Sequence, residues 1–248
     1  RINREVGGQL TLAIQIFKDE YPKHFLHQLV SGQLDMDRLD YLSRDSFYTG
    51  VSEGNIGAAR IIKMLDVKDD QLVVESKGIY SIENFLVARR LMYWQVYLHK
   101  TSVAYENMLV SALLRAKELA SKGVELFASP ALKFFLYNDI NRERFKSDPK
   151  CLENFILLDD NDIWTALKVW CNHNDIILAT LSQGMVNREI FKVEVSPTPC
   201  TEERLNAISE RIAKQLHINK EVKNFGKPCS RKSSRNRFCR TNLQNSKR

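Results

Sequence analysis

The sequence lacks the features that hold small secreted or membrane-bound proteins together. Its five cysteines are widely spaced and form no CxxC pair, which argues against a disulfide framework and a zinc knuckle. It has no run of about 18 apolar residues and no signal-peptide pattern, which argues against a membrane span and secretion. We therefore expect a cytoplasmic protein in a reducing compartment, with no membrane partner.

Acidic residues are absent from residues 223–248, which hold nine of the 37 lysines and arginines. The rest of the chain carries 28 basic against 30 acidic side chains, so the net charge of +7 belongs to this tail. The tail is also nearly free of apolar residues, which predicts disorder. Nucleic acid is therefore expected as a partner through the tail alone, by salt-sensitive contacts to phosphates.

Proline and glycine are absent from residues 81–120, where apolar residues recur every seven positions, so we predict a long helix in one or two pieces. Apolar spacing and breakers predict further helices at 9–20, 25–31, 35–45, 56–65, 131–137, 159–173, 175–183 and 201–216. Short strands are expected at 71–76 and 190–195, and loops at 46–55 and 138–149. The fold class is therefore mainly α with a small β component.

An unusual group of charged and phenolic residues lies at helical spacing in residues 35–48. Asp37, Tyr41 and Asp45 recur every four positions, on a face distinct from the buried stripe, and Arg38 stands beside them. Such a face is more often a solvated ion-pair network than a site. A second helix of the same character favours a site, since it carries the residues Arg89, Tyr93, Tyr97 and Lys100.

Two such faces have the groups that a metal-dependent, phosphate-cleaving site needs. A carboxylate can hold a divalent cation that polarises phosphoryl oxygens and activates water. Arginine, lysine and hydroxyl groups bind the remaining phosphates. Aromatic residues at helical spacing are more often core than ligand contacts, and that alternative applies above all to Tyr93.

The segment GQLDMDRLDYLSRDSFYTGV (residues 32–51) closely resembles the region around the last metal-ligating aspartate of HD-domain phosphohydrolases. The similarity is greatest to deoxynucleoside triphosphate triphosphohydrolases and their bacterial relatives. ENFLVARRLMYWQVYLHKT (residues 83–101) resembles the downstream helix of the same group. The resemblance covers roughly residues 1–220. It supports the prediction of a phosphohydrolase site more strongly than the residue spacing does.

The resemblance implies the C-terminal part of an HD-domain helical bundle, at residues 1–140. A small α+β appendage follows at 141–222, and the basic tail at 223–248. The implied reaction is hydrolysis of a deoxynucleoside triphosphate to nucleoside and triphosphate, with a divalent metal ion such as Mg, Mn or Fe as cofactor. Homo-oligomers are common in the family and are expected here.

Carried over residue by residue, the resemblance makes Asp37 the metal ligand. The positions implied to contact the nucleotide substrate are Arg38, Tyr41, Asp45, Arg89, Tyr97 and Lys100. Relatives often have lysine at the position of Arg38, and some have histidine at the position of Tyr93. Apart from the metal ligand Asp37, no catalytic residue is assigned.

The family's earlier His ligand and His-Asp pair have no match, because no histidine in this sequence directly precedes an aspartate. His24 and His27 have a spacing that could bind metal, but their amphipathic setting favours a structural role. Cys171 and His173, close to Asp175, are likewise expected to be a buried thiol and a helix-end histidine.

The missing ligands are therefore expected to lie before Arg1, in which case this chain is a fragment that is inactive alone. The alternative is a non-catalytic protein that binds nucleotides or nucleic acid and has lost the metal site.

Overall fold

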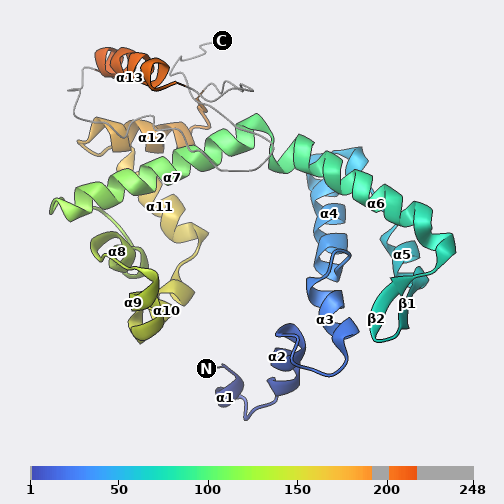
Figure 1. Ribbon diagram of the computed structural model, residues 1–248. Helices are drawn as coiled ribbons and strands as arrows, with labels where there is room; N and C mark the ends of the chain where they lie inside the picture. Colours follow the sequence, from blue (N-terminus) through green and yellow to red (C-terminus); the bar gives the residue numbers. More distant parts are fainter. Residues whose placement is uncertain (1, 192–200, 217–248) are drawn as a thin grey trace. The chain divides into compact units, whose positions relative to one another are not determined.

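Helices dominate the computed structural model, which describes residues 2–191 and 201–216 (Figure 1). Packing divides the chain into two units, Arg1–His99 and Lys100–Arg248. The mainly α fold class is thus confirmed. Among the described helices, none has the length and apolar character that crossing a bilayer requires.

The first unit contains short N-terminal helices, two longer helices and a hairpin. Its helices are α1 (Ile2–Glu5), α2 (Thr11–Phe17), α3 (His24–Ser31), α4 (Met36–Thr49), α5 (Ala58–Met64) and α6 (Ile79–Met92). Strands β1 (Leu65–Lys68) and β2 (Gln71–Val74) pair antiparallel, with Leu65 opposite Val74 and Lys68 opposite Gln71. Short 3₁₀ turns lie at Ser52–Gly54 and Ser76–Gly78, and a π-helical turn, Tyr93–Tyr97, follows α6.

Helix α4 packs against α6, and the core between them is made by the apolar stripes of both. The buried side chains are Leu39, Leu42, Ile56, Ile61, Phe85, Ala88 and Met92. Gly54 has no room for a side chain, since a Cβ there would lie 2.5 Å from the Met92 sulfur and 2.8 Å from the Ser46 Cβ. This close approach ties the end of α4 to the last turn of α6.

The hairpin turn Asp69–Asp70 also fastens α3. Both aspartates have positive φ, 52° and 57°, as a tight hairpin turn requires. The Asp70 carboxylate accepts a hydrogen bond of 2.9 Å from the His24 N–H at the start of α3. The Gln28 side chain in turn accepts from the Leu72 N–H at 2.7 Å. Helix α3, which leads to the site helix α4, is therefore held by β2 and its turn.

The second unit has a core of its own, built around α7. Its helices are α7 (Lys100–Ser121), α8 (Pro130–Tyr137), α9 (Arg142–Ser147), α10 (Pro149–Leu157), α11 (Asp160–Trp170), α12 (Ile176–Val186) and α13 (Glu202–Leu216). Helices α8 and α12 pack on α7, and α11 packs on α12 (Figure 1). Trp170 is fully buried, and its indole N–H donates to the Phe127 carbonyl at 3.0 Å.

A partly buried ion pair joins α7 to α12. Two guanidinium nitrogens of Arg115 lie 3.1 and 2.6 Å from the Asp175 carboxylate, which also caps α12 by accepting from the Leu178 N–H. Burial would raise the pKa of Asp175, but the hydrogen bonds from Arg115 and Leu178 lower it overall. Asp175 therefore has a structural role in the second unit.

Most predicted helices are present, and two expectations about loops are wrong. Residues 46–49, predicted as a loop, continue α4 to Thr49, and the helix ends at Gly50 with φ of 70°. The charged stretch before Pro149 forms α9, because Asn141 caps it by accepting from the Arg144 N–H. The long helix predicted across 81–120 is in two pieces, α6 and α7.

Two further expectations concern residues at or beyond the limits of the description, and a third concerns the domain boundary. The strand predicted at 190–195 falls mainly outside the described residues, and Ile190 and Phe191 have no regular structure. The disorder predicted for the tail also lies outside them. The chain divides into its two units between His99 and Lys100, whereas the predicted domain boundary lay at 140; that boundary stays a prediction.

Candidate functional site

The start of α4 is fixed by a buried aspartate that the sequence analysis did not single out. Asp35 is only 5% exposed, and its carboxylate caps α4 by accepting from the Arg38 N–H at 2.8 Å. The Arg38 guanidinium lies 3.4 Å from the same carboxylate and donates to the Gly32 carbonyl. Arg38, a predicted substrate contact, is therefore directed toward the helix cap and the turn before it.

Three phenols, a guanidinium and a carboxylate come together from α4, α6 and the π-helical turn. We call this group the tyrosine wall; it consists of Tyr41, Asp45, Arg89, Tyr93 and Tyr97. The Tyr97 hydroxyl donates to an Asp45 oxygen at 2.6 Å. The rings of Tyr41 and Tyr97 meet edge to face, with centroids 6.0 Å apart.

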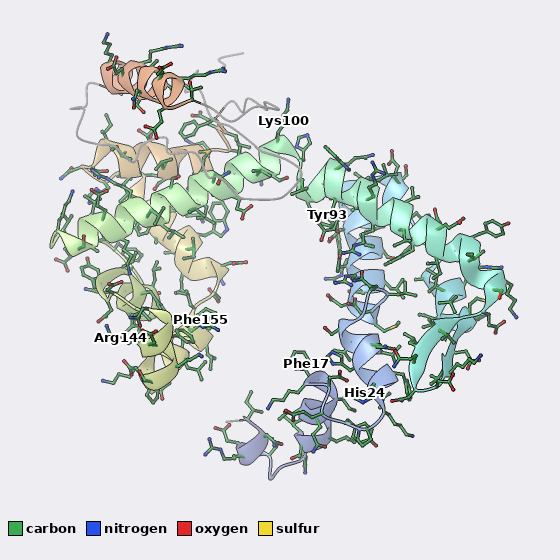
Figure 2. All side chains as sticks on the ribbon, in the orientation of Figure 1. Phe17, His24, Tyr93, Lys100, Arg144 and Phe155 are labelled. Atoms are coloured by element: carbon green, nitrogen blue, oxygen red, sulfur yellow. The ribbon has the colours of Figure 1, made fainter. Side chains whose placement is uncertain are left out.

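The other half of the tyrosine wall is formed by residues of α6 and the turn alone. Tyr93 lies at the C-terminal end of α6 (Figure 2). Its ring centroid is 5.2 Å from that of Tyr97, again edge to face. The guanidinium carbon of Arg89 lies 5.9 Å from the centre of the Tyr93 ring, within cation–π range. The predicted contacts Tyr41, Asp45, Arg89 and Tyr97 are thus neighbours in the structure.

The environment raises the pKa of two of these phenols above the ordinary value of tyrosine. Burial raises the pKa of Tyr41, and the nearby Tyr93 raises it further, while Arg89 and Arg38 oppose the shift. Burial also raises the pKa of Tyr97, and its hydrogen bond to Asp45 adds to the increase. Both hydroxyl groups therefore stay neutral to higher pH than a free tyrosine does, and that of Tyr97 donates to the Asp45 carboxylate.

The predicted metal ligand Asp37 lies exposed on the first turn of α4. Its carboxylate lies at the N-terminus of the helix, where a negative charge is stabilised by the helix dipole. Among the described residues, however, no group of three or more His, Cys, Asp and Glu side chains gathers to hold a metal ion. One carboxylate does not make a tight metal site, so the described residues by themselves do not fit the expected cofactor.

Lys100, a predicted substrate contact, does not belong to the same unit as the tyrosine wall. It is the exposed first residue of α7, in the second unit (Figure 2), whereas the wall belongs to the first unit. Its role as a substrate contact stays a prediction.

The histidines weighed as alternative metal ligands have other partners. His24 Nδ1 lies 2.8 Å from an Asp19 oxygen, and His27 Nδ1 lies 3.1 Å from the Ile16 carbonyl. In the second unit, His173 Nδ1 accepts from the Asp175 N–H at 2.9 Å. These contacts agree with the structural roles expected for them.

Two members of the site region were left out of the sequence assignment. Tyr93 was grouped with Arg89 and Tyr97 by its spacing, with a core role as the alternative, and the structure places it in contact with both. Asp35 precedes the apolar stripe of α4 as helix-capping aspartates do, a signal that was available in the sequence.

Comparison with known proteins identifies a family region in the middle of the chain. Residues 56–128 match the HD associated region. This segment includes α6 and the π-helical turn, which supply Arg89, Tyr93 and Tyr97 to the tyrosine wall.

A solved structure provides a strong match over most of the chain. The crystal structure of a phosphohydrolase from Bacteroides thetaiotaomicron is 75% identical, with a TM-score of 0.89, over 91% of this chain and 56% of that one. The predicted HD-type helical fold is confirmed by this similarity.

Curated relatives are more distant. The uncharacterized protein YwfO of Bacillus subtilis is 32% identical over 74% of this chain and 40% of its own length. A deoxynucleoside triphosphate triphosphohydrolase SAMHD1 homolog of Dictyostelium discoideum is 33% identical over 38% of this chain and 19% of its own.

The chain thus spans about half the length, or less, of the proteins that it matches. Together, the matched region and these similarities support an HD-type phosphohydrolase.

Proposed function

We propose that this chain supplies the substrate-binding wall of a metal-dependent HD-type phosphohydrolase that hydrolyses deoxynucleoside triphosphates to nucleoside and triphosphate. Support for the class comes from the HD associated region and the Bacteroides phosphohydrolase. Support for the substrate comes from the sequence resemblance and from the name of the Dictyostelium relative.

The observation that carries the proposal is the convergence of the tyrosine wall from separate elements. Arg89 offers a planar, permanently charged donor suited to phosphate oxygens. The Asp45 carboxylate accepts from Tyr97 through one oxygen, which leaves acceptor capacity for a sugar hydroxyl. The rings of Tyr41 and Tyr97 form an aromatic surface beside these groups.

Within this proposal, Asp37 is one ligand of the metal ion, and further ligands are needed that the described residues do not provide. The metal would supply a polarised phosphoryl oxygen and an activated water. This chain's own residues bind and orient the nucleotide.

The test is an assay of the intact protein with each deoxynucleoside triphosphate and Mn²⁺ or Mg²⁺, in which triphosphate release is measured. Asp37→Asn is compared with Asp40→Asn, since Asp40 is an exposed carboxylate on the same helix that pairs with Arg44. Loss of a metal ligand is expected to lower turnover by about 100-fold or more, because even supporting residues around metals typically matter by 10–100-fold. Asp40→Asn is expected to stay near wild type.

Two outcomes would count against the proposal. Absence of turnover with every nucleotide, together with unchanged metal content in Asp37→Asn, would rule out the metal-dependent activity. Nucleotide binding without turnover would instead favour the non-catalytic alternative.

A further inference from the structure

Tyr93 occupies the point at which the regular helix α6 passes into a wider turn. The Leu98 N–H donates to the Tyr93 carbonyl at 2.8 Å, a five-residue step that defines the π-helical turn. In a regular α-helix each residue is rotated about the helix axis by about 100° from the one before it. A residue four positions on therefore lies about 40° past a full turn, and the offset grows with each further step of four. In the wider π-helical turn the rotation per residue is smaller, so Tyr97 stays close to the helix face that carries Arg89.

The contacts of Tyr93 argue against a role in the core. Tyr93 is 39% exposed, whereas Tyr41 and Tyr97 are partly buried and pack on the core cluster of the first unit. The Tyr93 ring instead contacts the ring of Tyr97 and lies under the guanidinium of Arg89. It therefore connects the cation of the tyrosine wall to the phenol that binds Asp45.

We propose that Tyr93 is a positioning residue of this site: its ring holds the Arg89 guanidinium beside the wall and so raises the affinity for the polyphosphate part of the ligand. The inference rests on the proposed function, in which Arg89 binds phosphate. An arginine side chain has many rotamers. An aromatic ring that holds it in one rotamer before the ligand binds removes part of the entropy cost of binding.

The experiment is a double-mutant cycle on the intact protein, with inorganic triphosphate as the titrated ligand in calorimetry. Tyr93→Phe keeps the ring, and we expect its Kd to stay within about twofold of wild type. Tyr93→Leu removes the ring face, and we expect its Kd to rise about two- to fivefold, the range of an exposed cation–π contact. In an Arg89→Ala background, Tyr93→Leu should have no further effect.

Two controls separate positioning from general damage. Tyr80→Leu removes a 79% exposed tyrosine from the other end of α6, and Arg90→Ala removes the exposed arginine next to Arg89; neither should change the Kd. Thermal unfolding of each variant reports on stability independently. A merely structural role of Tyr93 would lower affinity equally with and without Arg89.

The outcomes distinguish this inference from the proposed function. If wild type binds triphosphate and Tyr93→Leu binds it equally well, or if the effects of Tyr93→Leu and Arg89→Ala add, the positioning role is wrong. If wild type does not bind triphosphate, the proposed function fails, and the inference fails with it.

Discussion

At the scale of single residues, the hydrogen bond between Tyr97 and Asp45 joins the two helices that form the tyrosine wall. It spans 52 positions in the sequence and brings a phenol from the π-helical turn after α6 to a carboxylate on α4. Spacing alone could place each residue on a helix face, but it could not show that these faces meet. The structure supplies that contact, and the roles in substrate binding stay predictions.

Because the pKa of Tyr97 is raised on folding, the protein should lose stability at high pH. The unfolded chain releases this proton near pH 10, while the folded protein keeps it, so the free energy of unfolding falls as pH rises above about 10. Tyr97→Phe should show a smaller loss, and Tyr80→Phe should follow wild type. Urea unfolding at pH 8 and pH 10.5 measures the difference. An identical pH dependence in Tyr97→Phe and wild type would contradict the raised pKa.

The contacts of Arg38 could be predicted only in part from the sequence. Arg38 was assigned as a substrate contact through the family resemblance, and a guanidinium group suits phosphate. The structure shows its guanidinium engaged with Asp35 and the Gly32 carbonyl, contacts that the planar fork of arginine favours. The sequence could not show this, because these contacts depend on the path of the backbone between Gly32 and Asp35, just before α4.

At the scale of elements, apolar periodicity predicted most helices but not how they end. Helix α4 continues past the predicted limit, since Ser46 and Thr49 bond to backbone carbonyls and do not interrupt the helix. The π-helical turn was also not predictable, because a shift from four-residue to five-residue bonding leaves no mark in composition. Helix α10 was missed, although Asp148 and Pro149 form a usual helix start.

Two glycines near the end of α4 should differ in their response to alanine. Gly50 has φ of 70° with open space around it, so Gly50→Ala should cost about 1 kcal/mol from the backbone alone. Gly54→Ala would drive a methyl group into Met92 and Ser46 and should cost about 1–3 kcal/mol. Gly57→Ala is the control and should change less, because φ there is negative and a Cβ would make only an ordinary contact, 3.9 Å from the Arg60 Cβ. Chemical denaturation of the three variants tests the order.

At the scale of the whole molecule, each unit has its own buried core. The core of the first unit lies between residues 39 and 92, and that of the second between residues 108 and 185. The tyrosine wall belongs entirely to the first unit. Each of these buried clusters is therefore made of residues from one unit alone.

Core substitutions should accordingly affect one unit at a time. Phe85→Ala and Trp170→Ala remove fully buried side chains, and each should cost about 3–5 kcal/mol in its own unit. Hydrogen exchange should show reduced protection in residues 36–92 for the first variant and in residues 104–186 for the second. Loss of protection throughout the chain in both variants would show instead that the cores unfold as one.

The hairpin turn Asp69–Asp70 has a consequence for protein engineering. Both positions have positive φ, so statistical turn preferences would recommend replacing them with Asn-Gly to relieve the backbone. That exchange would remove the carboxylate that accepts from the first N–H of α3. Optimising the turn by itself would thus loosen the helix that leads into the site, so Asp70 has to be kept in any stabilised variant.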